Sequence, residues 1–144
     1  MGEAVEHPIL GPLAWHEDED EAELFGVASG PSGLSVSVGV EVRRYEDDRR
    51  PPVGELLARA GELYTAMCER EGDIRAAATG WLATHIQMDP AVVRERVRWT
   101  QAFFFLDGYG QMVYDISELR WGRQSMFIDV GSGGWPIEGR TTLI

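Results

Sequence analysis

Residues 34–42 alternate strictly between apolar and small or polar side chains, and no other feature of the sequence constrains the fold as strongly. The residues between the apolar positions are serine, glycine or glutamate. A period of two places every apolar side chain on one face of a β-strand. The chain must therefore form a sheet that is buried on at least one face. The apolar positions are Leu34, Val36, Val38, Val40 and Val42.

The middle of the chain is typical of helices. Apolar residues recur at spacings of three and four over residues 53–68, and Gly72 suits a C-terminal cap of that helix. Asp73 can then cap a second helix, and residues 89–97 predict a third, shorter one that begins at an Asp-Pro pair. We expect two to three helices here.

The last third returns to strands. Residues 102–106 are apolar at every position, which predicts a central strand buried on both faces. The sequence Asp-Gly-Tyr-Gly at residues 107–110 indicates a hairpin turn, and further strands are expected over residues 112–116, 125–130 and 135–143.

Together these patterns predict an α+β fold. We expect a mostly antiparallel sheet of about six strands with two to three central helices packed on it, in the order βββ-ααα-ββββ. The length of 144 residues suits a single domain over residues 1–144, with an acidic loop at residues 16–23.

Composition excludes several classes of protein. The lone Cys68 excludes a disulfide framework, a four-cysteine zinc site and a pair of redox cysteines. No stretch approaches the ~18 apolar residues of a membrane span, and the N-terminus is acidic, unlike a secretory or transit signal. We therefore expect a cytoplasmic protein.

The charge is concentrated in one part of the chain. The net charge is -11, and the first 42 residues hold nine carboxylates and no arginine or lysine. Such a field disfavours binding to nucleic acid or to an anionic membrane, because both depend on neutralising phosphates. The natural complement is a basic protein partner.

The acidic run at residues 17–23 is the most unusual local feature. Six of its seven residues are carboxylates, which repel one another and favour an exposed loop. A solvated loop, a docking patch for a basic partner and a loose cation site are the three interpretations. The run lacks the glycine and the alternating oxygen ligands of a calcium loop.

Catalytic motifs find no support in the sequence. None of His7, His16 and His85 has the spacing of a metal site, and Cys68 lies on the apolar face of a predicted helix. There is no Gly-x-Ser-x-Gly motif and no glycine-rich phosphate loop before a helix. The basic cluster at residues 94–98 is interrupted by a glutamate, which favours pairing with carboxylates of the same chain.

Short segments resemble an uncharacterised bacterial family, the domain-of-unknown-function family numbered 2262. The resemblance implies one α+β domain and supplies no activity. The sequence differs from the Phe-Trp-Gly-His segment of that family, since Arg120 replaces the aromatic residue and Arg123 the histidine. The segments that carry the resemblance are Pro8-Ile9-Leu10-Gly11, Asp107-Gly108, Val113-Tyr114-Asp115, Leu119-Arg120-Trp121-Gly122 and Ile137-Glu138-Gly139.

These observations favour a non-enzymatic protein-binding domain. The specific hypothesis is an acidic immunity-type or inhibitor protein that neutralises a basic partner, either a toxin or a nucleic-acid-binding protein, without contacting nucleic acid itself. The alternative is a small enzyme or ligand-binding protein with a site assembled near Trp121, Arg123 and His85. No catalytic residue, metal ligand or cofactor is predicted. The expected partner-binding residues are Glu17, Asp18, Glu19, Asp20, Glu21, Glu23, Trp121 and Arg123.

Overall fold

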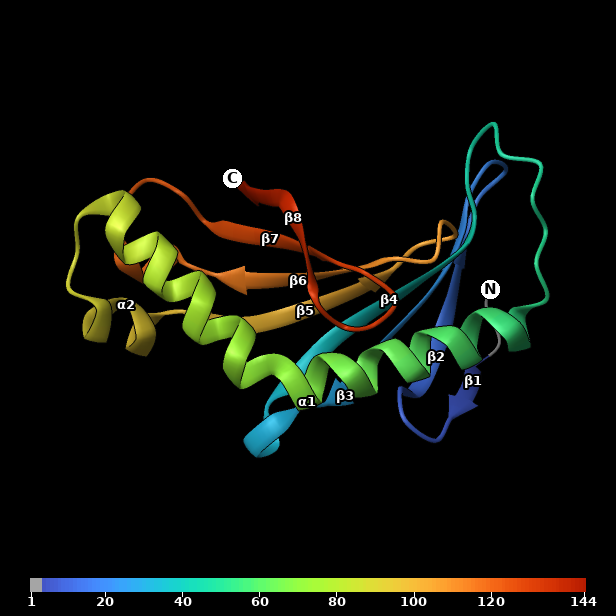
Figure 1. Ribbon diagram of the computed structural model, residues 1–144. Coiled ribbons are helices and arrows are strands. Elements are labelled where there is room, and N and C mark those ends of the chain that lie inside the picture. The colour runs from blue at the N-terminus through green and yellow to red at the C-terminus, as the bar shows by residue number, and fades with distance from the viewer. Residues whose placement is uncertain (1–3) are drawn as a thin grey trace.

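The computed structural model describes residues 4–144 and contains one eight-stranded sheet and two α-helices (Figure 1). The helices are α1, Val53–Ile86, and α2, Pro90–Arg96. The strands are β1 (Ala4–His7), β2 (Gly11–Glu17), β3 (Ala22–Ser29), β4 (Ser35–Arg43), β5 (Arg98–Phe104), β6 (Gly110–Asp115), β7 (Ser125–Val130) and β8 (Pro136–Leu143).

The strands lie in the sheet in their order along the chain, from β1 to β8. Every neighbouring pair is antiparallel except β4 and β5, which are parallel. The sheet therefore consists of two four-stranded antiparallel halves, β1–β4 and β5–β8, joined side by side. The two helices form the connection between them, as a parallel pair requires.

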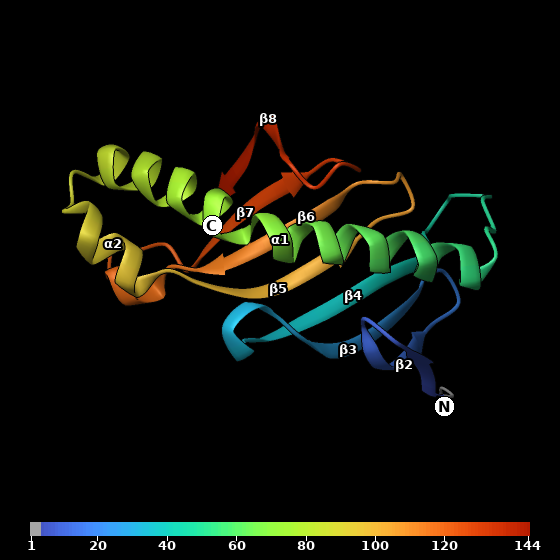
Figure 2. The same ribbon diagram turned by 60° about the horizontal axis from the view of Figure 1, so that its bottom comes forward.

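Helix α1 lies across one face of the sheet (Figures 1 and 2). The strand residues that face it form rows across the register: Val38 pairs with Ala102, Ala102 with Met112, and Met112 with Ile128, and all four are buried. Apolar residues at spacings of three and four on α1 form the other side of this core. Its buried apolar residues are Leu56, Leu57, Ala60, Leu63, Tyr64, Met67, Ile74, Leu82 and Ala83.

No element of residues 4–144 covers the opposite face of the sheet (Figures 1 and 2). Gly39 pairs with Phe25 on one side and with Phe103 on the other. A Cβ atom at Gly39 would lie 2.9 Å from the Phe103 ring and 3.1 Å from the Phe25 ring. The two phenyl rings therefore cover the glycine backbone, which explains the one glycine inside the alternating strand.

The predicted architecture was wrong in three respects, although the structure is an α+β fold. The sheet has eight strands instead of about six, it is mixed because of the parallel β4–β5 pair, and four strands precede the helices instead of three. The additional early strand is β1, Ala4–His7. The region of Ile9 and Leu10 is a turn in which both backbone N–H groups donate to Nδ1 of His7, at 3.2 Å each.

The two main helices predicted around Gly72 are one continuous helix. Glycine costs about 1 kcal/mol in a helix interior, which is a weak terminator. Met67 and Ile74, one on each side of Gly72, are both buried against the sheet, and their burial outweighs that cost. The short third helix is confirmed as α2, whose N-cap Asp89 accepts a hydrogen bond from the N–H of Ala91 at 2.8 Å.

Candidate functional site

The acidic run lies at the tip of the β2–β3 hairpin. Its ends belong to the two strands, so the turn itself is residues 18–21 and is shorter than the predicted loop at residues 16–23. The Asp18 carboxylate accepts hydrogen bonds from the backbone N–H groups of Asp20 and Glu21, at 2.8 Å each. These bonds lower the pKa of Asp18. Asp18 therefore organises the turn, and its neighbours carry exposed charge.

Arg43, at the end of β4, fixes the tip to the rest of the sheet. Its guanidinium donates to the Glu17 carboxylate at 3.2 Å and to three carbonyls, those of Asp18 at 2.7 Å, Asp20 at 3.5 Å and Glu21 at 3.4 Å. One arginine thus satisfies three carbonyls of the turn and only one carboxylate of the acidic run. The hairpin tip is held in place while it stays strongly negative.

Other arginines at this end of the sheet are engaged elsewhere. Arg44 pairs with Glu41 at 2.6 Å and with Asp107 at 3.1 Å, and Arg49 pairs with Asp47 at 2.6 Å and with Asp107 at 2.8 Å. The hydrogen bonds from Arg49 and Arg44 lower the pKa of Asp107. This network ties the loop after β4 to the β5–β6 turn, so its arginines do not neutralise the hairpin tip.

Within residues 4–144, five of the six carboxylates of the acidic run have no basic group within 4 Å: Asp18, Glu19, Asp20, Glu21 and Glu23. Glu23 also lies directly opposite Glu41 in the β3–β4 register. Partial burial raises the pKa of Glu23, and the negative charges of Glu21 and Glu41 raise it further. The run is therefore a site where an external positive charge would relieve repulsion that the chain itself leaves in place.

The structure divides the predicted partner-binding residues into two groups. Trp121 and Arg123 lie in the loop between β6 and β7, at the end of the sheet where α1 finishes (Figure 1). The acidic tip lies at the other end, near the start of α1 (Figures 1 and 2). At a rise of about 1.5 Å per residue, a helix as long as α1 has a length of roughly 50 Å. The two groups therefore do not form one compact site.

Trp121 contacts His85, as the alternative hypothesis requires. The rings of His85 and Trp121 meet edge to face with centroids 5.7 Å apart, and His85 stacks on Trp81 at 5.2 Å. Trp81 is 47% exposed and Trp121 is 37% exposed. Sequence reasoning missed Trp81, although its position four residues before His85 on one helix could have indicated it. Beside Trp81, an apolar groove of about 190 Å³ lies between α1 and strands β7 and β8.

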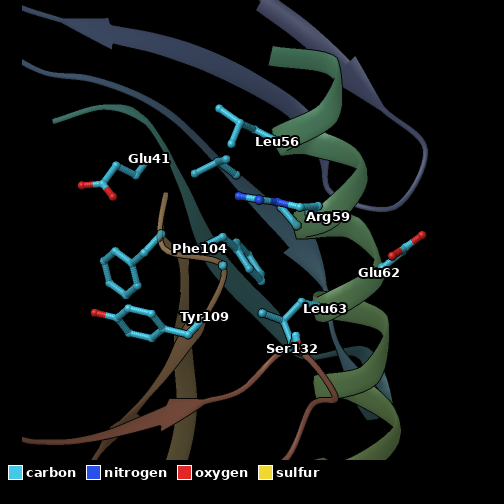
Figure 3. Close-up of a pocket in the computed structure, with 12 residues that line it drawn as sticks. Glu41, Leu56, Arg59, Glu62, Leu63, Phe104, Tyr109 and Ser132 are labelled. Atoms are coloured by element: carbon cyan, nitrogen blue, oxygen red, sulfur yellow. The ribbon is translucent and has the colours of Figure 1, made fainter. Parts of the chain in front are cut away.

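A second concave feature was not expected from the sequence. A pocket of about 220 Å³ lies between the first half of α1 and the β5–β6 turn (Figure 3). Leu56 and Leu63 of α1 face Phe104 and Tyr109 across it, and Ser132 of the β7–β8 loop lies at its edge. Its residues come from distant parts of the chain, so no local motif indicates it.

The described residues offer little for a metal site, a membrane-spanning helix or a reactive cysteine. Within residues 4–144, no group of three or more histidine, cysteine, aspartate or glutamate side chains is arranged to hold a metal ion. In the same part of the chain, neither helix has a stretch apolar enough and long enough to cross a membrane. Cys68 is half-buried on α1, and burial raises the pKa of its thiol, so it stays protonated at neutral pH.

Comparisons of the chain with models of protein families, with curated proteins and with solved structures found no match. The resemblance to family 2262 therefore stays a prediction.

Proposed function

We propose that the protein is a non-enzymatic binding domain that docks onto a basic protein through the tip of its β2–β3 hairpin, in the manner of an immunity-type protein or inhibitor. One observation carries the proposal: the ordered, exposed turn at residues 18–21 presents four carboxylates, none of which has a basic neighbour within 4 Å in the described chain. Arg43 and Asp18 hold this turn in one conformation, which lowers the conformational entropy lost on binding.

The expected consequence is fast association that depends on salt. Complementary fields raise association rates from about 10⁵–10⁶ M⁻¹s⁻¹ toward about 10⁸ M⁻¹s⁻¹ or more at low ionic strength. At 0.15 M ionic strength the screening length is about 8 Å, so much of that gain is lost. A partner's lysine or arginine beside Glu23 would also offset the repulsion that Glu23 experiences from Glu21 and Glu41.

The experiment compares two variants of equal net charge. The first, Glu19→Gln/Asp20→Asn/Glu21→Gln, neutralises the tip and leaves the turn-forming Asp18 and the Arg43 contacts intact. The control neutralises three exposed carboxylates of α1, in Glu55→Gln/Glu69→Gln/Asp73→Asn. The probe is a short peptide rich in lysine and arginine, and the measurement is its association rate by stopped flow at low and at physiological salt.

We expect the tip variant to slow association at low salt by about tenfold and the α1 variant to slow it much less. The salt dependence should also become weaker in the tip variant only. Equal losses in both variants would mean that the probe responds to net charge alone, and the proposed docking site would then be wrong.

A ligand-binding site at the cluster of Trp81, His85 and Trp121 is the second candidate function. The observation in its favour is the pair of ring contacts that bring His85 between two exposed tryptophans. Tryptophan fluorescence titrated with indole tests it, with His85→Ala as the variant. A saturable change that His85→Ala removes would support this site, and a linear response in both proteins would rule it out.

A further inference from the structure

The pocket beside the first half of α1 combines apolar walls with one arginine. Leu56, Leu63 and Phe104 are buried, and Tyr109 closes the side opposite α1. The Arg59 side chain extends from α1 toward the strand side of the pocket, whereas Glu62 points away from it (Figure 3). The pocket therefore has an apolar interior and a hydrogen-bond donor at its mouth.

Arg59 uses little of its hydrogen-bonding capacity. Its one hydrogen bond within residues 4–144 is to the carbonyl of Leu106, at 3.5 Å, and no carboxylate of that part of the chain lies within 4 Å. A guanidinium carries five N–H donors and stays charged at every physiological pH. The other four donors are thus free to meet the carbonyl groups of a bound chain.

The size of the pocket decides what it can hold. Pockets for drug-sized ligands measure about 300–1,000 Å³, which exceeds the 220 Å³ found here. An apolar cavity of about 150 Å³ in another protein holds benzene, so this pocket has room for one large apolar side chain. Interfaces commonly gain most of their affinity from a few such anchors in desolvated pockets.

The position of the pocket identifies the occupant. Glu41 lines the pocket and also lies opposite Glu23 of the acidic run, so the two features are neighbours at one end of the sheet. The apolar groove beside Trp81 lies on the second half of α1 and lacks this connection. A chain that approaches the acidic tip with basic residues can therefore reach this pocket with a nearby apolar residue.

We propose that this pocket receives a single phenylalanine- or leucine-sized side chain of the same basic partner, and that Arg59 donates to the main-chain carbonyl beside that residue. The inference rests on the proposed function and adds the anchor that gives the complex its affinity. Charged residues at the hairpin tip accelerate the encounter, and the pocket slows dissociation.

The pocket is tested directly with small probes. N-acetylphenylalanine amide and N-acetylalanine amide are titrated into the protein, and methyl NMR signals of Leu56 and Leu63 are followed. The phenylalanine probe should give saturable shifts and the alanine probe none. Ser132→Trp, which places a bulky ring at the exposed edge of the pocket, should abolish the shifts, and Ser132→Ala should preserve them. Absence of saturable shifts, or shifts that Ser132→Trp leaves unchanged, would overturn the proposal.

The anchor role is tested with two basic peptides that differ only by a central phenylalanine or alanine. Wild-type protein should bind the phenylalanine peptide at least tenfold more tightly, because a buried phenyl ring contributes that much through the hydrophobic effect. Ser132→Trp should remove the difference and leave the affinity for the alanine peptide unchanged. Arg59→Met, which keeps the aliphatic stem, should weaken the binding of both peptides about fivefold.

The outcomes separate the two proposals. Equal affinities of the two peptides for wild-type protein would overturn the anchor and leave docking at the acidic tip intact. Saturable NMR shifts at the pocket, with neither peptide binding, would support the pocket and refute the docking of a basic partner.

Discussion

Removing the hydroxyl of Tyr114 should destabilise the protein by about 2 kcal/mol. Tyr114 is fully buried, and its hydroxyl donates to Oε2 of Glu71 at 3.0 Å. Glu71 is only 2% exposed, and its other oxygen accepts a hydrogen bond from Arg75 at 3.1 Å. Burial and the adjacent Glu71 raise the pKa of Tyr114, so the hydroxyl remains a donor over the whole neutral range. Tyr114→Phe therefore leaves a buried carboxylate oxygen without its donor.

The magnitude follows from the charge on the acceptor. Hydrogen bonds to charged groups contribute about 1.5–3 kcal/mol, against about 1 kcal/mol for a neutral pair. Tyr64→Phe provides the neutral comparison, because the Tyr64 hydroxyl donates to the carbonyl of Ser29 at 2.8 Å. Tyr45→Phe provides the blank, because Tyr45 is exposed. The expected order of destabilisation is Tyr114, then Tyr64, then Tyr45, at about 2, 1 and 0 kcal/mol.

Urea denaturation followed by circular dichroism measures these free energies of unfolding. The slope of the unfolding free energy against urea concentration should stay constant, since unfolding exposes the same amount of surface in all three variants. For a chain of this size, 2 kcal/mol lowers Tm by about 4–8 °C. If Tyr114→Phe proves no more harmful than Tyr64→Phe, the Glu71 carboxylate is satisfied in some other way, and the reasoning from an unmet buried charge fails.

Three further predictions concern backbone packing and charge. Gly61→Ala should destabilise the protein by about 1–3 kcal/mol in thermal unfolding, because the new Cβ would lie 2.7 Å from the His7 ring. Gly72→Ala should instead stabilise α1 by about 0.5–1 kcal/mol, because its new Cβ would have no neighbour within 4 Å. Glu23→Gln should stabilise the protein at pH 7, because partial burial and neighbouring carboxylates raise the pKa of Glu23 in the folded state; urea titrations should show this gain disappearing as the pH falls below about 4.3. Asp107→Asn should destabilise it at pH 7, because two arginines lower the pKa of Asp107, and the difference from wild type should close as the pH falls below about 3.9. A constant difference at all pH values would contradict either charge prediction.

The sequence predicted correctly those parts of the fold that depend only on residues close together in the chain. The alternation over residues 34–42 corresponds to β4, in which Val36, Val38 and Val40 are buried, because a period of two fixes the face of a strand whatever its neighbours are. The Asp-Gly signal at residues 107–110 corresponds to the β5–β6 turn, where Gly108 has a φ of 90°. The parallel pairing of β4 with β5 was missed, because it depends on how α1 folds back over the sheet.

In the candidate site, too, local features could be predicted from the sequence and long-range contacts could not. The acidic run can be recognised from its composition, and the repulsion between its carboxylates is enough to predict that it is exposed. The role of Arg43 does not follow from the sequence, since it depends on a bulge in the β3–β4 register near Ala22 that brings the end of β4 to the turn. The pocket at Arg59 was also missed, because it requires four separated segments to meet.

The single parallel pair sets the order in which this chain can fold. Each antiparallel half of the sheet is a series of neighbouring hairpins, so its contacts close short loops and can form early. Pairing Ser37 with Gln101 must instead close a loop of about sixty residues, at a greater entropic cost. We therefore expect the two halves to form independently and their seam, with α1 packed across it, to be completed last. Substitutions along the seam should then change the unfolding rate more than the folding rate.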